Sequence, residues 1–356
     1  MIFGKAKNLV GLDIGDNSIK IVEVKDLGRA KGYQLLGLAL EPLSSEAIVD
    51  GSIMDSGLVI DAIHRAYEKS GIKNKNLATA LSGHSVIIKR ISLPVMSKEE
   101  LAESIRWEAE QYIPFDIEDV NIDYQILEGV SLSGEGNMDV LLAAVKKERI
   151  NDYVSVLSQA GLNPLVVDVD AFALQNAYEA NYDVEPQDNI ALIDMGASVT
   201  TIVIMKGANS VFWRDISIGG NQYTDAIQKE LNLTAEQAEK LKCGEDLEKV
   251  SFESVFPIIS SVTSDVISEI QKTVDFFKAT TAIDEAISKI VVTGGASQIY
   301  NFRQAFTDRF GVSVEILNPF RKIIANTRDF PPELLNKMAS SACVAVGLAL
   351  RKAGEK

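Results

Sequence analysis

The chain has few cysteines and histidines, the residues that build zinc centres. Its 356 residues include two cysteines, Cys243 and Cys343, and two histidines, His64 and His84. The cysteines lie far apart, no CxxC pair occurs, and neither histidine has a partner at metal-ligand spacing, so a structural zinc site is not expected. Scarce, unpaired cysteines are typical of a reducing compartment, which predicts a cytoplasmic protein.

Positive charge and long apolar runs are also scarce. Lys and Arg number 35 against 50 Asp and Glu, which gives a net charge of −15 and a pI of about 4.7. Nucleic-acid binding needs clustered basic side chains, and an anionic membrane would repel this charge, so neither is an expected direct partner. The longest weakly polar stretch, Met338–Leu350, is shorter than the ~20 residues of a membrane span, and no signal peptide is visible. Membrane attachment is therefore expected only through a partner.

The chain does contain an internal repeat. LDIGDNSIKIVEVK, residues 12–25, and IDMGASVTTIVIMK, residues 193–206, both predict a strand, an Asp-x-Gly turn and a second strand. A further strand candidate follows each of them, at residues 33–43 and 210–220. Because the copies lie about half a chain apart and 46% of the residues are hydrophobic, the pattern predicts two related α/β lobes.

The two turns carry residues suited to holding a phosphate chain. Glycine at Gly15 or Gly196 lets backbone N–H groups approach phosphate oxygens closely. Lys20 could reach a phosphate from the returning strand, and Asp13 and Asp194 could hold Mg²⁺ through water. A single such turn is as well explained by an ordinary β-turn. Two of them, each in a hairpin, favour a clamp that grips a triphosphate from both sides.

Two further elements are candidates for the nucleoside end of such a ligand. The apolar strand IVVTGGAS, residues 290–297, runs into Gly294-Gly295, which leaves space for a flat ring or a sugar before an expected helix. Glu239 and Lys242 share one helical face and could bind ribose hydroxyls. The alternatives are a tight strand-to-helix turn and a surface ion pair.

A region between the first lobe's strands predicts an inserted α+β unit. Ser97 and Glu100 form a capping box that opens one helix. A second helix is expected over residues 147–160, stopped by Gly161. Strands are expected over residues 86–93, 120–127, 138–145 and 163–170. Further on, long helices are expected over residues 262–280 and 340–352, the latter rich in small residues that permit close packing.

In combination these motifs resemble the actin-like ATPase superfamily. GLDIGDNSIK, LIDMGASVTT and VVTGGAS match its two phosphate motifs and its adenosine motif, and residues 170–177 and 341–350 match its two connecting helices. The resemblance implies an α/β, ribonuclease H-like, two-lobed fold that binds ATP and Mg²⁺. The nucleotide-binding residues that it implies are Asp13, Gly15, Asp16, Asn17, Ser18, Lys20, Asp194, Gly196, Ala197, Ser198, Gly219, Gly220, Glu239, Lys242, Gly294, Gly295 and Ala296, with Asp13 and Asp194 also at the metal.

Within this superfamily the sequence resembles the PilM family of type IV pilus assembly proteins. The insertion has the position of the 1C subdomain of the FtsA and PilM branch, and the segments 1–15, 105–127 and LNPF, 317–320, are similar to PilM. The resemblance implies four parts: 1A at 1–85, 164–188 and 326–356; 1C at 86–163; 2A at 189–221 and 286–325; and 2B at 222–285.

The same resemblance implies partners and a function. A PilM-like protein is expected to bind the N-terminal cytoplasmic peptide of PilN in a groove between 1A and 1C, which places it at the inner face of the inner membrane. Contacts with pilus motor ATPases and self-association are also implied. The alternatives are an FtsA-like filament former in cell division and a small-metabolite kinase with the same core. The secretion protein GspL is similar but continues into a membrane span.

One position departs from the superfamily pattern. Asp16 stands where a Ser or Thr is usual beside the terminal phosphate, and a carboxylate there repels phosphate unless Mg²⁺ or Lys20 compensates. At most slow ATP hydrolysis is therefore expected. Asp170 is the candidate for positioning the attacking water, and a helix N-cap is the alternative role for it.

Overall fold

The computed structural model describes residues 8–28, 30–127, 136–248, 250–280 and 286–354. Residues 1–7, which contribute to the PilM resemblance, lie outside these ranges. Within the described ranges no helix is both long and apolar enough to cross a membrane.

The first sheet has six strands in the order β10-β6-β1-β2-β3-β16. β1, β2 and β3 form an antiparallel meander, and β6, β10 and β16 join it in parallel. We call this sheet and the helices packed on it lobe 1. Its strands are β1 (Val10–Ile14), β2 (Ser18–Asp26), β3 (Tyr33–Pro42), β6 (Asn76–Leu81), β10 (Asn163–Val169) and β16 (Ile323–Ile324).

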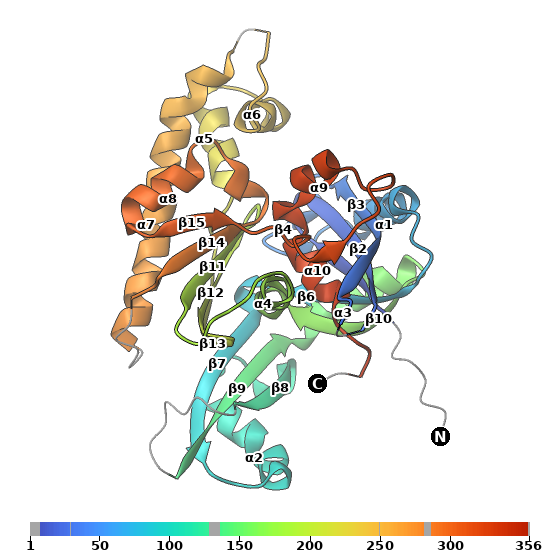
Figure 1. The fold of residues 1–356 in the computed structure, drawn as a ribbon, viewed down its shortest axis with the longest axis vertical. Coiled ribbons are helices and arrows are strands. Elements are labelled where there is room, and N and C mark those ends of the chain that lie inside the picture. The colour runs from blue at the N-terminus through green and yellow to red at the C-terminus, as the bar shows by residue number, and fades with distance from the viewer. Residues whose placement is uncertain (1–7, 29, 128–135, 249, 281–285, 355–356) are drawn as a thin grey trace.

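The second sheet has five strands in the order β13-β12-β11-β14-β15, and with its helices it forms lobe 2 (Figure 1). β11, β12 and β13 form an antiparallel meander, and β14 and β15 follow in parallel. Its strands are β11 (Asn189–Met195), β12 (Thr200–Lys206), β13 (Asn209–Ile216), β14 (Lys289–Thr293) and β15 (Ser313–Ile316).

The two sheets therefore share one topology, as the internal repeat in the sequence predicted. In each, a three-strand meander opens with the hairpin that carries an Asp-x-Gly turn, and two parallel strands extend the sheet from the first strand of that hairpin. The parallel strands follow helices because a parallel connection must cross over the sheet. Both Asp-x-Gly turns consequently lie at the carboxyl end of a central strand, where parallel α/β sheets usually bind ligands.

A third sheet is inserted between β6 and β10. It has the order β7-β9-β8, is antiparallel throughout, and with α2 forms what we call the inserted subdomain, at the bottom of Figure 1. Alternate residues of its strands, among them Ile91, Val140 and Leu142, pack with Leu101 and Ile105 of α2. The elements are β7 (Val86–Pro94), α2 (Lys98–Glu110), β8 (Val120–Leu127) and β9 (Asn137–Lys146).

The remaining elements are mostly helical. Lobe 1 has α1, α3, α4, α9 and α10, and lobe 2 has α5 to α8. Two short strands, β4 (Ile48–Val49) and β5 (Ser52–Ile53), form a separate hairpin. The helices are α1 (Ser56–Ser70), α3 (Lys147–Gln159), α4 (Asp170–Asn181), α5 (Asn221–Leu231), α6 (Ala235–Lys242), α7 (Phe256–Thr280), α8 (Phe302–Phe310), α9 (Pro332–Met338) and α10 (Cys343–Ala349), with short 3₁₀ turns at residues 83–85, 117–119, 252–255, 295–298 and 340–342.

Several helix boundaries differ from those expected. α7 begins at Phe256 rather than near Val262, because a 3₁₀ turn feeds directly into it and Pro257 is tolerated in a first helical turn. The helix expected over 340–352 is a 3₁₀ turn followed by α10. Gly294-Gly295 leads into a 3₁₀ turn, not an α-helix. The capping box of Ser97 and Glu100 is present.

Helices α4 and α10 lie between the two sheets and join the lobes. Ala173 and Ala177 of α4 pack in lobe 1 against α10, whereas Leu174 and Tyr178 pack against Leu192 of β11 in lobe 2. The helices approach closely because Gly347 of α10 faces the backbone of α4: a Cβ there would overlap the carbonyl of Ala173. The expected role of small residues in this helix is thus confirmed.

Candidate functional site

One cavity, of about 580 Å³, is lined by both Asp-x-Gly turns and by residues of both lobes. Its size suits a small-molecule ligand. All of the residues proposed from the sequence for nucleotide, metal or water positioning line it except Gly219. The motifs that are far apart in the chain therefore meet in space.

The lobe 1 wall is the turn between β1 and β2. The N–H of Gly15 donates to the carbonyl of Ser18 at 3.1 Å and closes the turn. Asp13 and Lys20 are direct neighbours across the hairpin, and Lys20 Nζ lies 3.2 Å from Asp13 Oδ2. The hairpin register therefore places one carboxylate and one ammonium at the cavity floor.

The lobe 2 wall repeats this geometry. The N–H of Gly196 donates to the carbonyl of Val199 at 3.0 Å, and Asp194 stands at the position of Asp13. Asn221 connects the two walls, because its side chain donates to Ser198 Oγ at 3.0 Å and accepts from Asn17 Nδ2 at 3.1 Å. The turns are thus held face to face, as a clamp on a phosphate chain requires.

Glycines allow the close backbone approaches around these turns. Gly219 lies behind the cavity wall, where a Cβ would overlap the carbonyl of Ala197. Gly294 has a φ of 84°, and a Cβ there would overlap the carbonyl of Met195. Neither position has room for a side chain, so both shape the site through their backbone.

The pair expected at the nucleoside end is formed and is partly buried. Lys242 Nζ lies 2.5 Å from Glu239 Oε2 and donates to Thr224 Oγ1 at 2.9 Å. Lys242 is buried, whereas a surface pair would leave both partners in water. The pair therefore belongs to the cavity wall.

Aspartates concentrate negative charge at the cavity: Asp13, Asp16, Asp50, Asp170 and Asp194 line it, and Asp215 lies beside it. Burial, and then the charge of Asp13, raise the pKa of Asp194 to about 7, against the opposing charge of Lys20. Burial, and then the charge of Asp13, also hold the pKa of Asp170 well above its usual range. Burial raises the pKa of Asp215, against hydrogen bonds from Gly83 and Thr201. Such a group of carboxylates favours a bound cation.

The donor set fits Mg²⁺ held largely through water. In the part of the chain that the structure describes, no three His, Cys, Asp or Glu side chains are grouped closely enough to hold a metal directly. Mg²⁺ keeps several waters and usually takes one or two carboxylates together with substrate phosphates. Asp13 and Asp194, on opposite walls, suit that role. Asp170 is the first residue of α4 and caps nothing, since the N-cap is Val169, so the alternative N-cap role is not observed.

Several cavity residues were not expected from the sequence. The turn between β4 and β5 reaches the cavity, as do the 3₁₀ turn after β6 and the first two turns of α3. The Asp-Gly and Ser-Gly dipeptides of the two turns were available as signals, but nothing local marks the helical residues. These additional residues include Asp50, Gly51, Ser82, Gly83, Arg149, Tyr153, Cys243, Gln298, Ser340 and Ser341.

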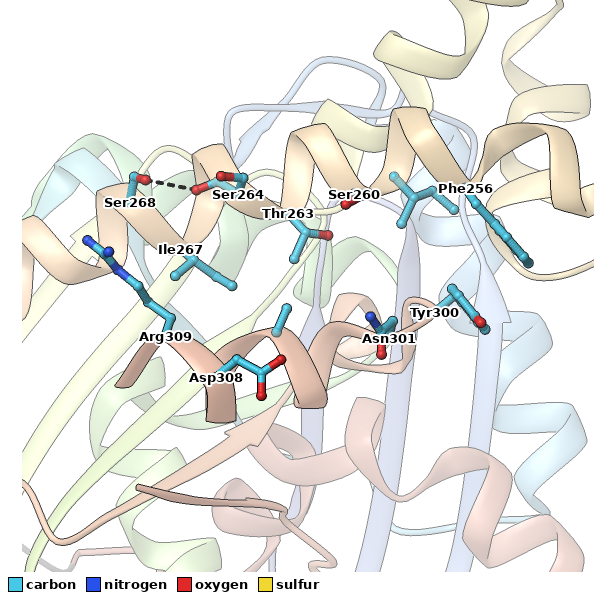
Figure 2. Close-up of a pocket in the computed structure, with 12 residues that line it drawn as sticks. Phe256, Ser260, Thr263, Ser264, Ile267, Ser268, Tyr300, Asn301, Asp308 and Arg309 are labelled. Atoms are coloured by element: carbon cyan, nitrogen blue, oxygen red, sulfur yellow. Dashed lines mark hydrogen bonds between the residues drawn. The ribbon is translucent and has the colours of Figure 1, made fainter. Parts of the chain in front are cut away.

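A second cavity, of about 590 Å³, lies between α7 and α8 on lobe 2. Figure 2 shows serines and a threonine of α7 facing Tyr300, Asn301, Asp308 and Arg309 across it. At one end the rings of Phe256 and Tyr300 stack with centroids 4.4 Å apart. Among the described residues that line this groove, Asp308 is the one carboxylate and no glycine turn occurs, so the first cavity is the better candidate site.

Comparisons with known proteins identify relatives over most of the chain. The family model described as type IV pilus assembly protein PilM matches residues 11–353. In the solved PilM-PilN type IV pilus biogenesis complex, a chain superimposes with a TM-score of 0.86 and 29% identity, covering 97% of this chain and 98% of that one.

More distant relatives share the core. The cell division protein FtsA of Enterococcus hirae is 28% identical over 353 residues, which cover 87% of this chain and 78% of FtsA. The structure of MreB5 of Spiroplasma citri bound to AMPPNP has a TM-score of 0.53 and 14% identity, covering 97% of this chain and 95% of that one, a likeness of fold alone. The fold is therefore the actin-like α/β fold, as expected.

Proposed function

The chain belongs to the type IV pilus assembly protein PilM family, and from this membership we propose that it is an ATP-binding scaffold of the pilus assembly platform. ATP and Mg²⁺ occupy the cavity between the lobes, and the nucleotide sets the angle between them. Turnover is slow at most, because Asp16 adds negative charge beside the phosphates. The protein works in the cytoplasm at the inner face of the inner membrane, held there by PilN.

The observation that carries the nucleotide assignment is the pairing of the two Asp-x-Gly turns across one cavity. Both turns present a glycine backbone and a carboxylate to the same space, and Asn221 holds them together. A triphosphate with Mg²⁺ matches this pattern, since backbone N–H groups can take the phosphate oxygens and the carboxylates can take the waters of the metal.

Alkylation of Cys243 provides a direct test of nucleotide binding. Cys243 is exposed and lines the cavity beside Glu239. A bound ligand in such a site has most of its surface covered, so we expect ATP and Mg²⁺ to slow the reaction of Cys243 with a maleimide about 5-fold or more. Partial burial of the sulfur, and then the charge of Glu239, raise the pKa of this thiol, so labelling is best followed near pH 8.5 by mass spectrometry.

Cys343 is the internal control for this experiment. It is buried, and its sulfur accepts a hydrogen bond from Thr293 Oγ1 at 2.7 Å. We expect it to stay unlabelled with and without nucleotide. Equal labelling of Cys243 at saturating ATP and without ATP would contradict the nucleotide assignment.

For the PilN peptide we propose a site between lobe 1 and the inserted subdomain. β10 is an edge strand of the first sheet and β8 an edge strand of the third, so each can pair with an added extended segment. Leu165 of β10 is 43% exposed and offers an apolar contact. Asp168 forms an ion pair with Arg351 at 3.3 Å, and Asp123 of β8 is close enough to raise the pKa of Asp168.

Substitution of Leu165 tests this site. We expect Leu165→Asp to weaken binding of a fluorescent peptide from the N-terminus of PilN about 10-fold or more, because it adds a charge to an apolar contact. Fluorescence anisotropy measures the affinity. Ile316→Asp is the matched control, since Ile316 is 40% exposed on β15, an edge strand of lobe 2. Equal losses of peptide affinity in the two variants would show that the peptide does not bind between lobe 1 and the inserted subdomain.

A cell-division role is the second candidate, favoured by the similarity to FtsA across 78% of the Enterococcus hirae protein. The same peptide experiment separates the two functions. A wild-type protein that does not bind the PilN peptide at all would favour the FtsA-like alternative.

A further inference from the structure

Arg149 is a cavity residue that neither phosphate turn provides. It lies in the first turn of α3, directly after β9, and lines the same cavity as Asp13 and Asp16. Its Nη1 donates to the carbonyl of Gly51 at 2.6 Å, and Tyr153 Oη donates to the same carbonyl at 3.2 Å. The helix thus reaches the cavity through the turn between β4 and β5.

In the part of the chain that the structure describes, three cationic side chains line this cavity, and two of them have a carboxylate partner in its wall. Lys20 pairs with Asp13 and Lys242 with Glu239. For Arg149, within the described ranges, the interaction found is the bond to the neutral carbonyl of Gly51. A guanidinium carries five N–H donors and this bond uses one, so the others can serve a ligand.

The place of Arg149 in its helix also requires an explanation. The positive end of a helix dipole disfavours cations in the first turn, yet Lys147 and Arg149 flank a single acid, Glu148, at the start of α3. Lys147 is directed to the carbonyl of Glu118, away from the cavity. Arg149 therefore lies where the helix dipole is unfavourable for a cation, on a cavity that is also lined by aspartates.

Arg149 and Tyr153 line the same cavity as Asp13, Asp16 and Asp170. Burial raises the pKa of Tyr153, which is also raised by Asp170, Asp16 and Asp13 and lowered by Arg149. The guanidinium consequently shares its surroundings with Asp16, the residue that stands where a Ser or Thr is usual, and can offset the charge that Asp16 adds.

We propose that Arg149 binds the terminal phosphate of the nucleotide and so discriminates ATP from ADP. The proposal rests on the proposed nucleotide site. A planar guanidinium suits a phosphate because it donates two parallel hydrogen bonds. ADP lacks the group that Arg149 would contact. Since β9 is the central strand of the inserted sheet, the same residue links the state of the nucleotide to the subdomain that flanks the proposed peptide site.

The test compares the affinities of purified variants for ATP and for ADP, each with Mg²⁺, by isothermal titration calorimetry. We expect Arg149→Gln to lose about 10- to 100-fold in ATP affinity, the usual effect of removing a charge-assisted hydrogen bond. The affinity for ADP should change less than about 3-fold. Arg149→Lys keeps the positive charge but lacks the two parallel donors of a guanidinium. Its affinity for ATP should fall between those of the wild type and Arg149→Gln.

Two controls separate this role from a structural one. Tyr153→Phe removes the other bond to Gly51 and should leave the ratio of ATP to ADP affinity within about 2-fold of wild type. Arg106→Gln changes an exposed arginine on α2 that pairs with Glu118 and should change neither affinity. Equal losses for ATP and ADP in Arg149→Gln, or no loss, would overturn the proposal while leaving nucleotide binding intact. A wild type that binds neither nucleotide would overturn the nucleotide site and this proposal together.

Discussion

Replacement of Asp194 by asparagine is expected to stabilise the nucleotide-free protein at neutral and higher pH while weakening its binding of ATP and Mg²⁺ by about 10-fold or more. The carboxylate is placed where its charge is costly without a cation, since burial and Asp13 raise its pKa to about 7. Asparagine keeps the shape of the side chain and removes the charge. The substitution should therefore raise the stability of the nucleotide-free protein and lower its affinity for ATP and Mg²⁺.

The pH dependence follows from the direction of the shift. Below about pH 4 Asp194 is protonated in the folded and the unfolded chain, and the substitution should change little. Between about pH 4 and 7 the unfolded chain releases its proton while the folded one keeps it, so the stability of the wild type falls as pH rises. Above about pH 7 the full penalty applies, about 4 kcal/mol for a pKa raised from 3.8 to about 7.

Urea unfolding of the wild type and Asp194→Asn at pH 4.5 and pH 8 measures the first effect, and calorimetric titration with ATP measures the second. Asp183→Asn is the matched control, because Asp183 is an exposed aspartate paired with Lys322. We expect it to leave nucleotide affinity unchanged. A destabilised Asp194→Asn at pH 8 would show that this carboxylate is stabilised in the empty site.

Replacement of Gly347 by alanine is expected to destabilise the protein by about 3 kcal/mol or more. The added methyl group would overlap the carbonyl of Ala173, and α10 cannot retreat, because a Cβ at Gly11 of β1 would overlap its other side at Ala345. Overpacking of a core usually costs 1–3 kcal/mol, and backbone cannot move aside as a side chain does. Thermal and urea unfolding measure the loss.

Gly57→Ala is the control for helical glycine. Gly57 is exposed in the first turn of α1, and the nearest atom to an added Cβ is the side chain of Asp55 at 3.2 Å. Alanine favours a helix over glycine by up to about 1 kcal/mol, so this variant should be neutral or slightly stabilised. A Gly347→Ala variant as stable as the wild type would mean that α4 and α10 are not held together as described.

The fold was largely readable from local patterns that repeat. The Asp-x-Gly hairpins at Asp13 and Asp194 predicted two related sheets, because alternating apolar residues and a glycine turn are local properties of a strand pair. The capping box at Ser97 and the extent of β8 were likewise local, and the structure confirms both.

The features that the sequence did not predict depend on contacts between elements that lie far apart in the chain. Arg149 and Tyr153 sit on an ordinary amphipathic helix, and their place in the cavity arises only because β9 delivers α3 beside the β4–β5 turn. The start of α7 at Phe256 was missed because its first turn is continuous with a 3₁₀ turn. The sequence left a surface ion pair open as the alternative role of Lys242, because only the packing in space shows that this side chain is buried and donates to Thr224.

The position of α10 between the lobes has a consequence for synthesis on the ribosome. All the strands of the second sheet, β11 to β15, come from one continuous stretch of chain, residues 189–316, so lobe 2 can fold as soon as that stretch has emerged. Five strands of the first sheet, β1, β2, β3, β6 and β10, are made earlier, but the part of one face that α10 covers stays exposed until that helix is made. Lobe 1 thus begins to be synthesised first but is completed last. A chaperone that shields apolar surface would be needed longest on its first strands.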